Sequence, residues 1–112
     1  MFLILSISSC VQKSSKKIII VKVDVTGIKD IKTVGIRGNQ KPLSWKKDME
    51  MNPIVKDTLY TTSFSLITGY KFTEIKFTVN GKTELNEKEN RKIIFNNGDT
   101  TFYEAKFDTP NK

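Results

Sequence analysis

Three carboxylates lie within one short segment, and their type and spacing come nearest to catalytic chemistry in this sequence: Glu84, Glu87 and Glu89. Two carboxylates about 5 to 9 Å apart can hydrolyse a glycosidic bond, but such pairs normally sit in a deep cleft. A chain of 112 residues leaves little room for one, so we expect no enzymatic activity. The alternative for this segment is structural, with Arg91 pairing with Glu84 or Glu87.

The remaining reactive side chains exclude most other chemistries. The chain contains no histidine, which removes the usual general base, the commonest metal ligand and every Ser-His or Cys-His pair. Cys10 is the single cysteine, so neither an intramolecular disulfide nor a cysteine-based zinc site can form. Asp24, Asp30 and Glu50 offer the oxygen ligands that Ca²⁺ prefers, but no loop carries such ligands in dense alternation. We expect no metal and no cofactor.

The first ten residues resemble a signal for export. Met1 to Leu5 is apolar, and Ile7-Ser8-Ser9-Cys10 resembles the lipobox of bacterial lipoproteins, in which the signal is cut before a lipid-bearing cysteine. The resemblance implies a truncated lipoprotein signal at residues 1–9, lipid attachment at Cys10 and a tether over residues 10–16. It implies an exported protein of the bacterial cell envelope, in the periplasm or on the surface, that meets the membrane only through its lipid. The alternative is a first strand or an apolar tail.

The charge of the chain is basic but comes almost entirely from lysine. The chain has 19 Lys+Arg against 12 Asp+Glu and a formal net charge of +7, yet arginine occurs only at Arg37 and Arg91. Nucleic-acid readers favour arginine, because its guanidinium makes bidentate contacts with guanine and stacks on bases. Lysines scattered along strands are more often solvated surface, so we expect no nucleic-acid partner.

Alternation of apolar and polar residues predicts strands along the rest of the chain. It is clearest from Val21 to Val25, and it recurs at residues 32–37, 58–66, 70–79, 92–95 and 101–107. Asn80-Gly81 is the strongest hairpin signal, because both residues tolerate positive φ, and Leu85 is expected to start the return strand. The segment after Gly38 is expected to be a loop that includes Pro53.

Such spacing of short strands, with no convincing helix, indicates an all-β sandwich or barrel. We expect one domain over residues 17–109 and a short tail at residues 110–112. The phenylalanines of these strands are expected mainly in its core: Phe64, Phe72, Phe77, Phe102 and Phe107.

The order of motifs over residues 18–108 resembles the starch-binding and glycogen-binding carbohydrate modules. The segments that carry the resemblance are Gly38 to Trp45, Met49 to Met51, Leu59 to Thr62, Ile75 to Gly81, Glu84-Leu85 and Asn90-Arg91. Modules of that family are immunoglobulin-like β-sandwiches. The resemblance therefore implies an immunoglobulin-like β-sandwich of six to eight short, mostly antiparallel strands.

The same resemblance implies a sugar-binding site. In the family, a loop tryptophan stacks on a glucose ring, because axial hydrogens make one sugar face apolar, and nearby polar groups bond the hydroxyls. By position, Trp45 is the platform, Lys76 is the donor from the central strand, and Asn90 comes from the loop after the hairpin. Glu84 lies near the place of a second family tryptophan that this chain lacks, and Tyr70 is the candidate second platform.

Two functions follow from these expectations. The first is non-catalytic binding of an α-glucan by an exported lipoprotein, with a separate enzyme or envelope protein as a further partner. The second is a structural or protein-interaction domain of the envelope that kept the fold and lost the sugar site. Exposure of Trp45 distinguishes the two, because a tryptophan folded back into the sandwich cannot stack on a sugar.

Overall fold

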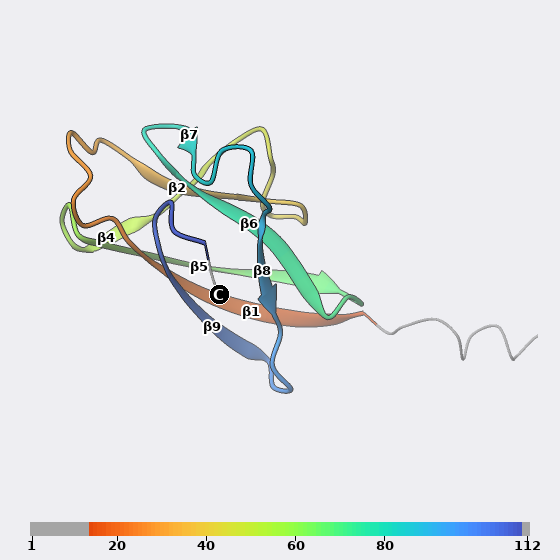
Figure 1. Cartoon of the computed structure of the whole chain (residues 1–112). Helices are drawn as coiled ribbons and strands as arrows, with labels where there is room; N and C mark the ends of the chain where they lie inside the picture. The colour runs from red at the N-terminus through yellow and green to blue at the C-terminus, as the bar shows by residue number, and fades with distance from the viewer. Residues whose placement is uncertain (1–13, 111–112) are drawn as a thin grey trace, which may run out of the picture.

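The computed structural model describes residues 14–110, in which every regular element is a β-strand (Figure 1). The strands are β1 (Ser15–Asp24), β2 (Val34–Gly38), β3 (Met49–Glu50), β4 (Asn52–Val55), β5 (Leu59–Thr68), β6 (Phe72–Val79), β7 (Lys82–Thr83), β8 (Arg91–Ile94) and β9 (Thr100–Lys106). The all-β prediction is confirmed. Within the described range, no helix is long and apolar enough to cross a membrane.

The strands form two sheets that lie one over the other in Figure 1. The four-stranded sheet has the order β4-β5-β1-β9, and the five-stranded sheet has the order β3-β2-β6-β7, with β8 also paired to β6. Each pairing is antiparallel except that of β1 with β9, which run parallel. The expectation of a sandwich-like, mostly antiparallel arrangement is confirmed.

The period-two alternation of the sequence separates core from surface in both sheets. Ile19, Val21 and Val23 of β1 are fully buried, as are Ile75 and Phe77 of β6, and all five belong to one apolar core. Successive side chains of a strand point to opposite faces, so these residues share the inward faces of the two sheets. Full burial of one such side chain stabilises the fold by about 1.5–3 kcal/mol.

The phenylalanines follow the core prediction with one clear exception. Phe64 and Phe77 are buried as expected. Phe102 is 71% exposed, so its predicted core position is wrong. The alternation along β9 turns Phe102 outward, whereas the neighbouring Thr101 and Tyr103 face the interior. Two more phenylalanines are half-buried: Phe72 and Phe107.

The Asn80-Gly81 turn has the predicted backbone conformation, with φ of 53° at Asn80 and 80° at Gly81. The return strand is the two-residue β7, not a strand that starts at Leu85. Leu85 lies beyond the strand, with φ of 52°, and its side chain is buried. The ladder ends after Thr83, because the amide of Phe77 donates to Oε2 of Glu84 at 2.9 Å and not to its backbone carbonyl, although the amide of Glu84 still donates to the carbonyl of Phe77 at 3.0 Å.

Two expected boundaries are corrected. The first strand begins at Ser15, inside the predicted tether, because this end of β1 continues its pairing with β5 as far as Thr68. Pro53 lies in β4 rather than in a loop, and an edge strand accepts proline because no ladder bond is lost on its open side. Three predicted parts lie outside the described residues: the signal at residues 1–9, Cys10 and residues 111–112 of the tail.

Candidate functional site

Of the predicted sugar-binding residues, Lys76 lies on a strand, on the outward face of the five-stranded sheet. On β6, Ile75 and Phe77 are buried, so the alternating residues Glu74 and Lys76 face outward. The antiparallel pairing of β2 with β6 places Arg37 directly beside Lys76. The alternation of two central strands thus brings polar and basic side chains together on one surface.

Arg37 ties the loop that carries Trp45 to this surface. Its Nε donates to Oδ1 of Asp48 at 2.6 Å, and its Nη1 donates to the carbonyl oxygen of Trp45 at 3.2 Å. Its Nη2 donates to the carbonyl oxygen of Gly81 at 3.3 Å. The second oxygen of Asp48 accepts the hydroxyl of Thr78 at 2.9 Å. One guanidinium therefore fixes two loops at the same edge of the sheet surface.

Trp45 itself is 38% exposed. A stacking platform needs a ring that solvent, and therefore a ligand, can reach. The backbone of the residue is anchored through Arg37, so the exposed ring is presented from a fixed point of the loop.

Lys76 is half-buried and holds a second loop in place. Its Nζ donates to the carbonyl oxygens of Leu85 and Lys88, both at 3.0 Å. The amide of Lys88 in turn donates to the carbonyl of Leu85 at 2.9 Å. The ammonium group expected to bind a sugar hydroxyl thus serves first to shape the loop between β7 and β8.

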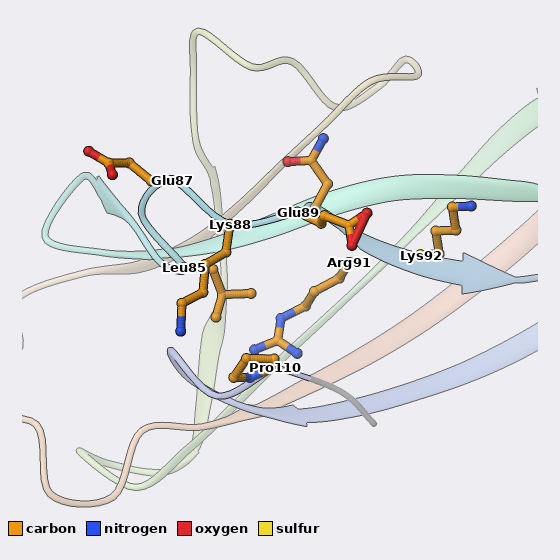
Figure 2. A pocket seen from close by; sticks show the side chains of 8 residues that line it. Leu85, Glu87, Lys88, Glu89, Arg91, Lys92 and Pro110 are labelled. Carbon is orange, nitrogen blue, oxygen red and sulfur yellow. The ribbon is translucent and has the colours of Figure 1, made fainter.

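An open hollow of about 720 Å³ lies against this loop (Figure 2). It is lined by Leu85, Glu87, Lys88, Glu89, Asn90, Arg91, Lys92 and Pro110. The Nδ2 of Asn90 donates to Oε1 of Glu74 at 3.0 Å, which connects the rim of the hollow to the outward face of β6. Hydroxyl-rich ligands suit such a mixture of carboxylate, ammonium and amide groups.

Glu84, which was predicted to contact a sugar, is not accessible to one. The residue is only 2% exposed, and both oxygens of its carboxylate are occupied. Oε2 accepts the amide of Phe77 at 2.9 Å and Nε of Arg91 at 2.6 Å, while Oε1 accepts Nη2 of Arg91 and the amide of Asp108, each at 2.8 Å. Of the two carboxylates expected to pair with Arg91, Glu84 is the one that does so.

The guanidinium of Arg91 is itself held by several groups. Burial alone would lower the pKa of Arg91, but the hydrogen bond and charge of Glu84, with a further contribution from Tyr103, raise it. The Nη2 of Arg91 also donates to the carbonyl oxygens of Lys106 and Thr109, at 2.9 and 2.8 Å. This ion pair therefore joins the loop before β8 to the end of the chain and serves the fold.

Tyr70 lies apart from the other predicted ligands. It is 69% exposed at the turn between β5 and β6, where its amide donates to the hydroxyl of Thr68 at 3.0 Å. β6 begins only at Phe72, and the strand spans about 13 Å from there to Lys76. Tyr70 therefore lies beyond the start of β6, whereas Arg37, which binds the carbonyl oxygen of Trp45, lies beside the middle of that strand.

Sequence reasoning missed the residues that organise this surface, above all Arg37, Asp48 and Glu74. A signal was present for Arg37, because it is one of two arginines in a lysine-rich chain and its planar fork suits several simultaneous bonds. Asp48 and Glu74 carry no comparable signal, since their roles depend on pairings between distant segments.

No protein-family model matches this chain, and no curated protein sequence matches it.

Proposed function

We propose that this chain is an immunoglobulin-like β-sandwich that binds an α-glucan without catalysis, exported and attached to the cell envelope through a lipid on Cys10. Support for the fold comes from the two-layer arrangement of mostly antiparallel strands. Support for the sugar class comes from the motif order that resembles starch-binding and glycogen-binding modules. A separate enzyme or envelope protein is a further partner in this proposal, and nucleic acid is not.

The observation that carries the proposal is the exposure of Trp45, at 38%, on a loop whose backbone Arg37 anchors. The apolar face of a glucose ring binds most tightly to a flat aromatic side chain that is already fixed in place, because no free energy is then lost in ordering that side chain on binding. Lys76 lies next to Arg37 on the same face, and Asn90 lies at the rim of the hollow. We infer that the ring stacks on Trp45 and that Asn90 binds a hydroxyl, while Lys76 positions the loop. Tyr70 is left for a more distant part of a long glucan.

The proposal is tested by titrating the full chain with maltoheptaose. Trp45 is the only tryptophan, so any change in tryptophan fluorescence reports on this site alone. We expect saturable quenching, and calorimetry of the Trp45→Ala variant should show at least about tenfold weaker binding, which corresponds to about 1.4 kcal/mol. Phe102→Ala, which removes an exposed aromatic from the other sheet, should bind as the unaltered chain does. Unchanged fluorescence and no heat of binding would contradict the proposal.

The lipid attachment is tested separately. Cys10→Ala should move the protein from the membrane fraction to the soluble fraction in a bacterial host, because the acyl chains supply the membrane affinity. A variant that still partitions into membranes would refute the lipid anchor and leave the sugar site untouched.

An interaction domain that has lost sugar binding is the second candidate function. It is favoured by the exposed aromatic residue Phe102 on the edge strand β9, since exposed apolar groups on an open sheet edge invite pairing with another chain. Absence of glucan binding together with association through β9 would favour this alternative.

A further inference from the structure

β9 is the longest edge strand among residues 14–110, and it forms one border of the four-stranded sheet (Figure 1). The other terminal strands are short or interrupted, although β4 pairs with only Leu59 to Thr61 of β5 and leaves the rest of that side of β5 without a strand partner. β3 and β7 have two residues each, β8 has four, and β4 carries Pro53 and a register shift between Pro53 and Val55. Short length, proline and bulges protect an edge from pairing with another chain. β9 has none of these features over its seven residues.

Two hydrogen bonds establish which backbone groups of β9 face the open edge. The amide of Phe107 donates to the carbonyl of Asp24, and the amide of Ile18 donates to the carbonyl of Asp99, both at 2.8 Å. Backbone groups alternate sides along a strand, so the odd-numbered residues of β9 direct their N–H and C=O groups to β1. Residues 100, 102, 104 and 106 therefore direct theirs outward.

Carbonyls at both ends of this outward row are already bound within the chain. The carbonyl oxygen of Thr100 accepts Nδ2 of Asn96 at 2.5 Å, and that of Lys106 accepts Nη2 of Arg91 at 2.9 Å. Between them, the N–H and C=O groups of Phe102 and Glu104 have no partner among residues 14–110. Four polar backbone groups thus face outward in the middle of the edge.

We propose that this edge binds a second copy of the chain, with β9 of each copy antiparallel about a two-fold axis at Tyr103. In this register Phe102 lies opposite the partner's Glu104, and the two residues exchange both of their backbone hydrogen bonds. The symmetric pair does the same, so the N–H and C=O groups of Phe102 and Glu104 are all used. The two bound carbonyls are left undisturbed, and the amides of Thr100 and Lys106 lie at the ends of this ladder. Such an interface is self-complementary and closes at the dimer.

The side chains on the outer face fit this register. Phe102 is 71% exposed and lies in register with Ile20 of β1. A hollow of about 240 Å³ opens beside it, lined by Ile20, Lys22, Phe102, Tyr103 and Glu104. The partner's Phe102 would lie across from Glu104, at the rim of this hollow, and within diagonal reach of Phe102 itself. The ring of Phe102 in each copy, which is exposed to water in the single chain, would then contact apolar atoms of the partner.

A second copy fits this edge better than an unrelated extended segment. The open N–H and C=O groups of Phe102 and Glu104 are arranged symmetrically about Tyr103. Two identical β9 strands can therefore pair their donors with acceptors without any change in backbone conformation. Glu104 lies in register with Lys22 on β1, which places an opposite charge near each carboxylate at the axis and limits repulsion between the copies. The interface is small, so we expect a weak, concentration-dependent dimer.

The test is sedimentation velocity of the full chain over a wide range of concentrations. We expect a reversible monomer–dimer equilibrium. Glu104→Pro should abolish the dimer, because it removes an N–H from the open side while leaving the ladder to β1 intact. Phe102→Lys tests the same contact without altering the backbone. Ile94→Lys is the matched control, because Ile94 is equally exposed, at 71%, on the edge strand β8 of the other sheet.

Hydrogen exchange tests the register. Raising the concentration should slow exchange at the amides of Phe102 and Glu104, whereas those of Thr101 and Tyr103, which face β1, should change little. The proposal is overturned by a monomer at every concentration, by a dimer that survives both Glu104→Pro and Phe102→Lys, or by protection that rises on β4 or β8 instead.

Discussion

Nε of Arg91 lies 2.6 Å from Oε2 of Glu84, and both side chains are almost completely inaccessible to solvent, at 1% and 0% exposed. Through these two residues the structure joins β6, β8 and the end of the chain, because Glu84 also accepts amides from Phe77 and Asp108. Buried charges persist only where each is paired and hydrogen-bonded. The pair therefore links the loop before β8 both to β6 and to the residues that follow β9.

Removing one member of this pair should be strongly destabilising. Arg91→Met leaves the Glu84 carboxylate buried without its cation, and we expect a loss of about 3–5 kcal/mol in the free energy of unfolding. The double variant Glu84→Leu/Arg91→Met should recover part of this loss, since no uncompensated charge remains. Urea denaturation followed by circular dichroism measures all three proteins.

Arg37→Met is the matched control for that experiment. Arg37 and Asp48 also lie 2.6 Å apart, but their side chains are 22% and 24% exposed. Solvent screens such a pair, so the expected loss is about 1 kcal/mol. Equal losses in Arg37→Met and Arg91→Met would show that burial does not control the strength of these pairs.

Lys76 should control the mobility of the loop that borders the hollow. Lys76→Met removes the hydrogen bonds to the carbonyls of Leu85 and Lys88, so we expect faster hydrogen exchange at the amide of Lys88 and only a small fall in melting temperature. Lys92→Met is the control, because Lys92 lies over the ring of Phe72 at 4.8 Å on the same sheet and binds no loop carbonyl among the described contacts. Unchanged exchange in Lys76→Met would contradict this positioning role.

Local signals in the sequence were sufficient to predict most strands and the tight turn at Asn80-Gly81. The alternation at Val21 to Val25 and the pair Asn80-Gly81 depend on neighbouring residues only, and both behave as expected. The parallel pairing of β1 with β9 could not be predicted in this way, because it joins segments about 80 residues apart whose alternation is the same in either direction.

The site was harder to predict than the fold for the same physical reason. Carboxylates are expected at the surface, and nothing near Glu84 in the sequence distinguishes it from the exposed Glu87 and Glu89. Its burial depends on Arg91, which reaches this loop residue from the start of β8. The side chain of Lys76 points outward, as the alternation along β6 predicts. Its hydrogen bonds to loop carbonyls depend on the path of the loop between β7 and β8, and alternation along a strand carries no information about that path.

Gly38 should not tolerate a side chain, although its backbone needs no special conformation. A Cβ at Gly38 would lie 2.7 Å from Cδ1 of Leu43 and 2.9 Å from the carbonyl oxygen of Glu74. We expect Gly38→Ala to lower the free energy of unfolding by about 1–3 kcal/mol through overpacking. At Gly98 the nearest atom to such a Cβ is 3.6 Å away, so Gly98→Ala should change stability by less than about 0.5 kcal/mol. Comparable losses in both variants, measured by thermal denaturation, would contradict the close approach at Gly38.

Asp24 should give the fold a small dependence on acid pH. Its Oδ1 accepts the hydroxyl of Thr26 at 2.5 Å and the amide of Thr26 at 2.8 Å, and these bonds, with the nearby charge of Lys106, lower the pKa of Asp24 below its ordinary value. Because the pKa is lower in the folded than in the unfolded chain, the stabilisation is present above the unfolded pKa. It is lost as the pH falls through the folded pKa.

Thr26→Val removes the hydroxyl and keeps the amide, so it should return the pKa of Asp24 part of the way to its ordinary value. Carboxyl carbon chemical shifts measured during an acid titration report that pKa directly. The same variant should lose less stability than the unaltered chain when both are acidified, because less of its stability depends on the charged carboxylate. An Asp24 titration curve that does not move in Thr26→Val would show that the hydroxyl does not cause the shift.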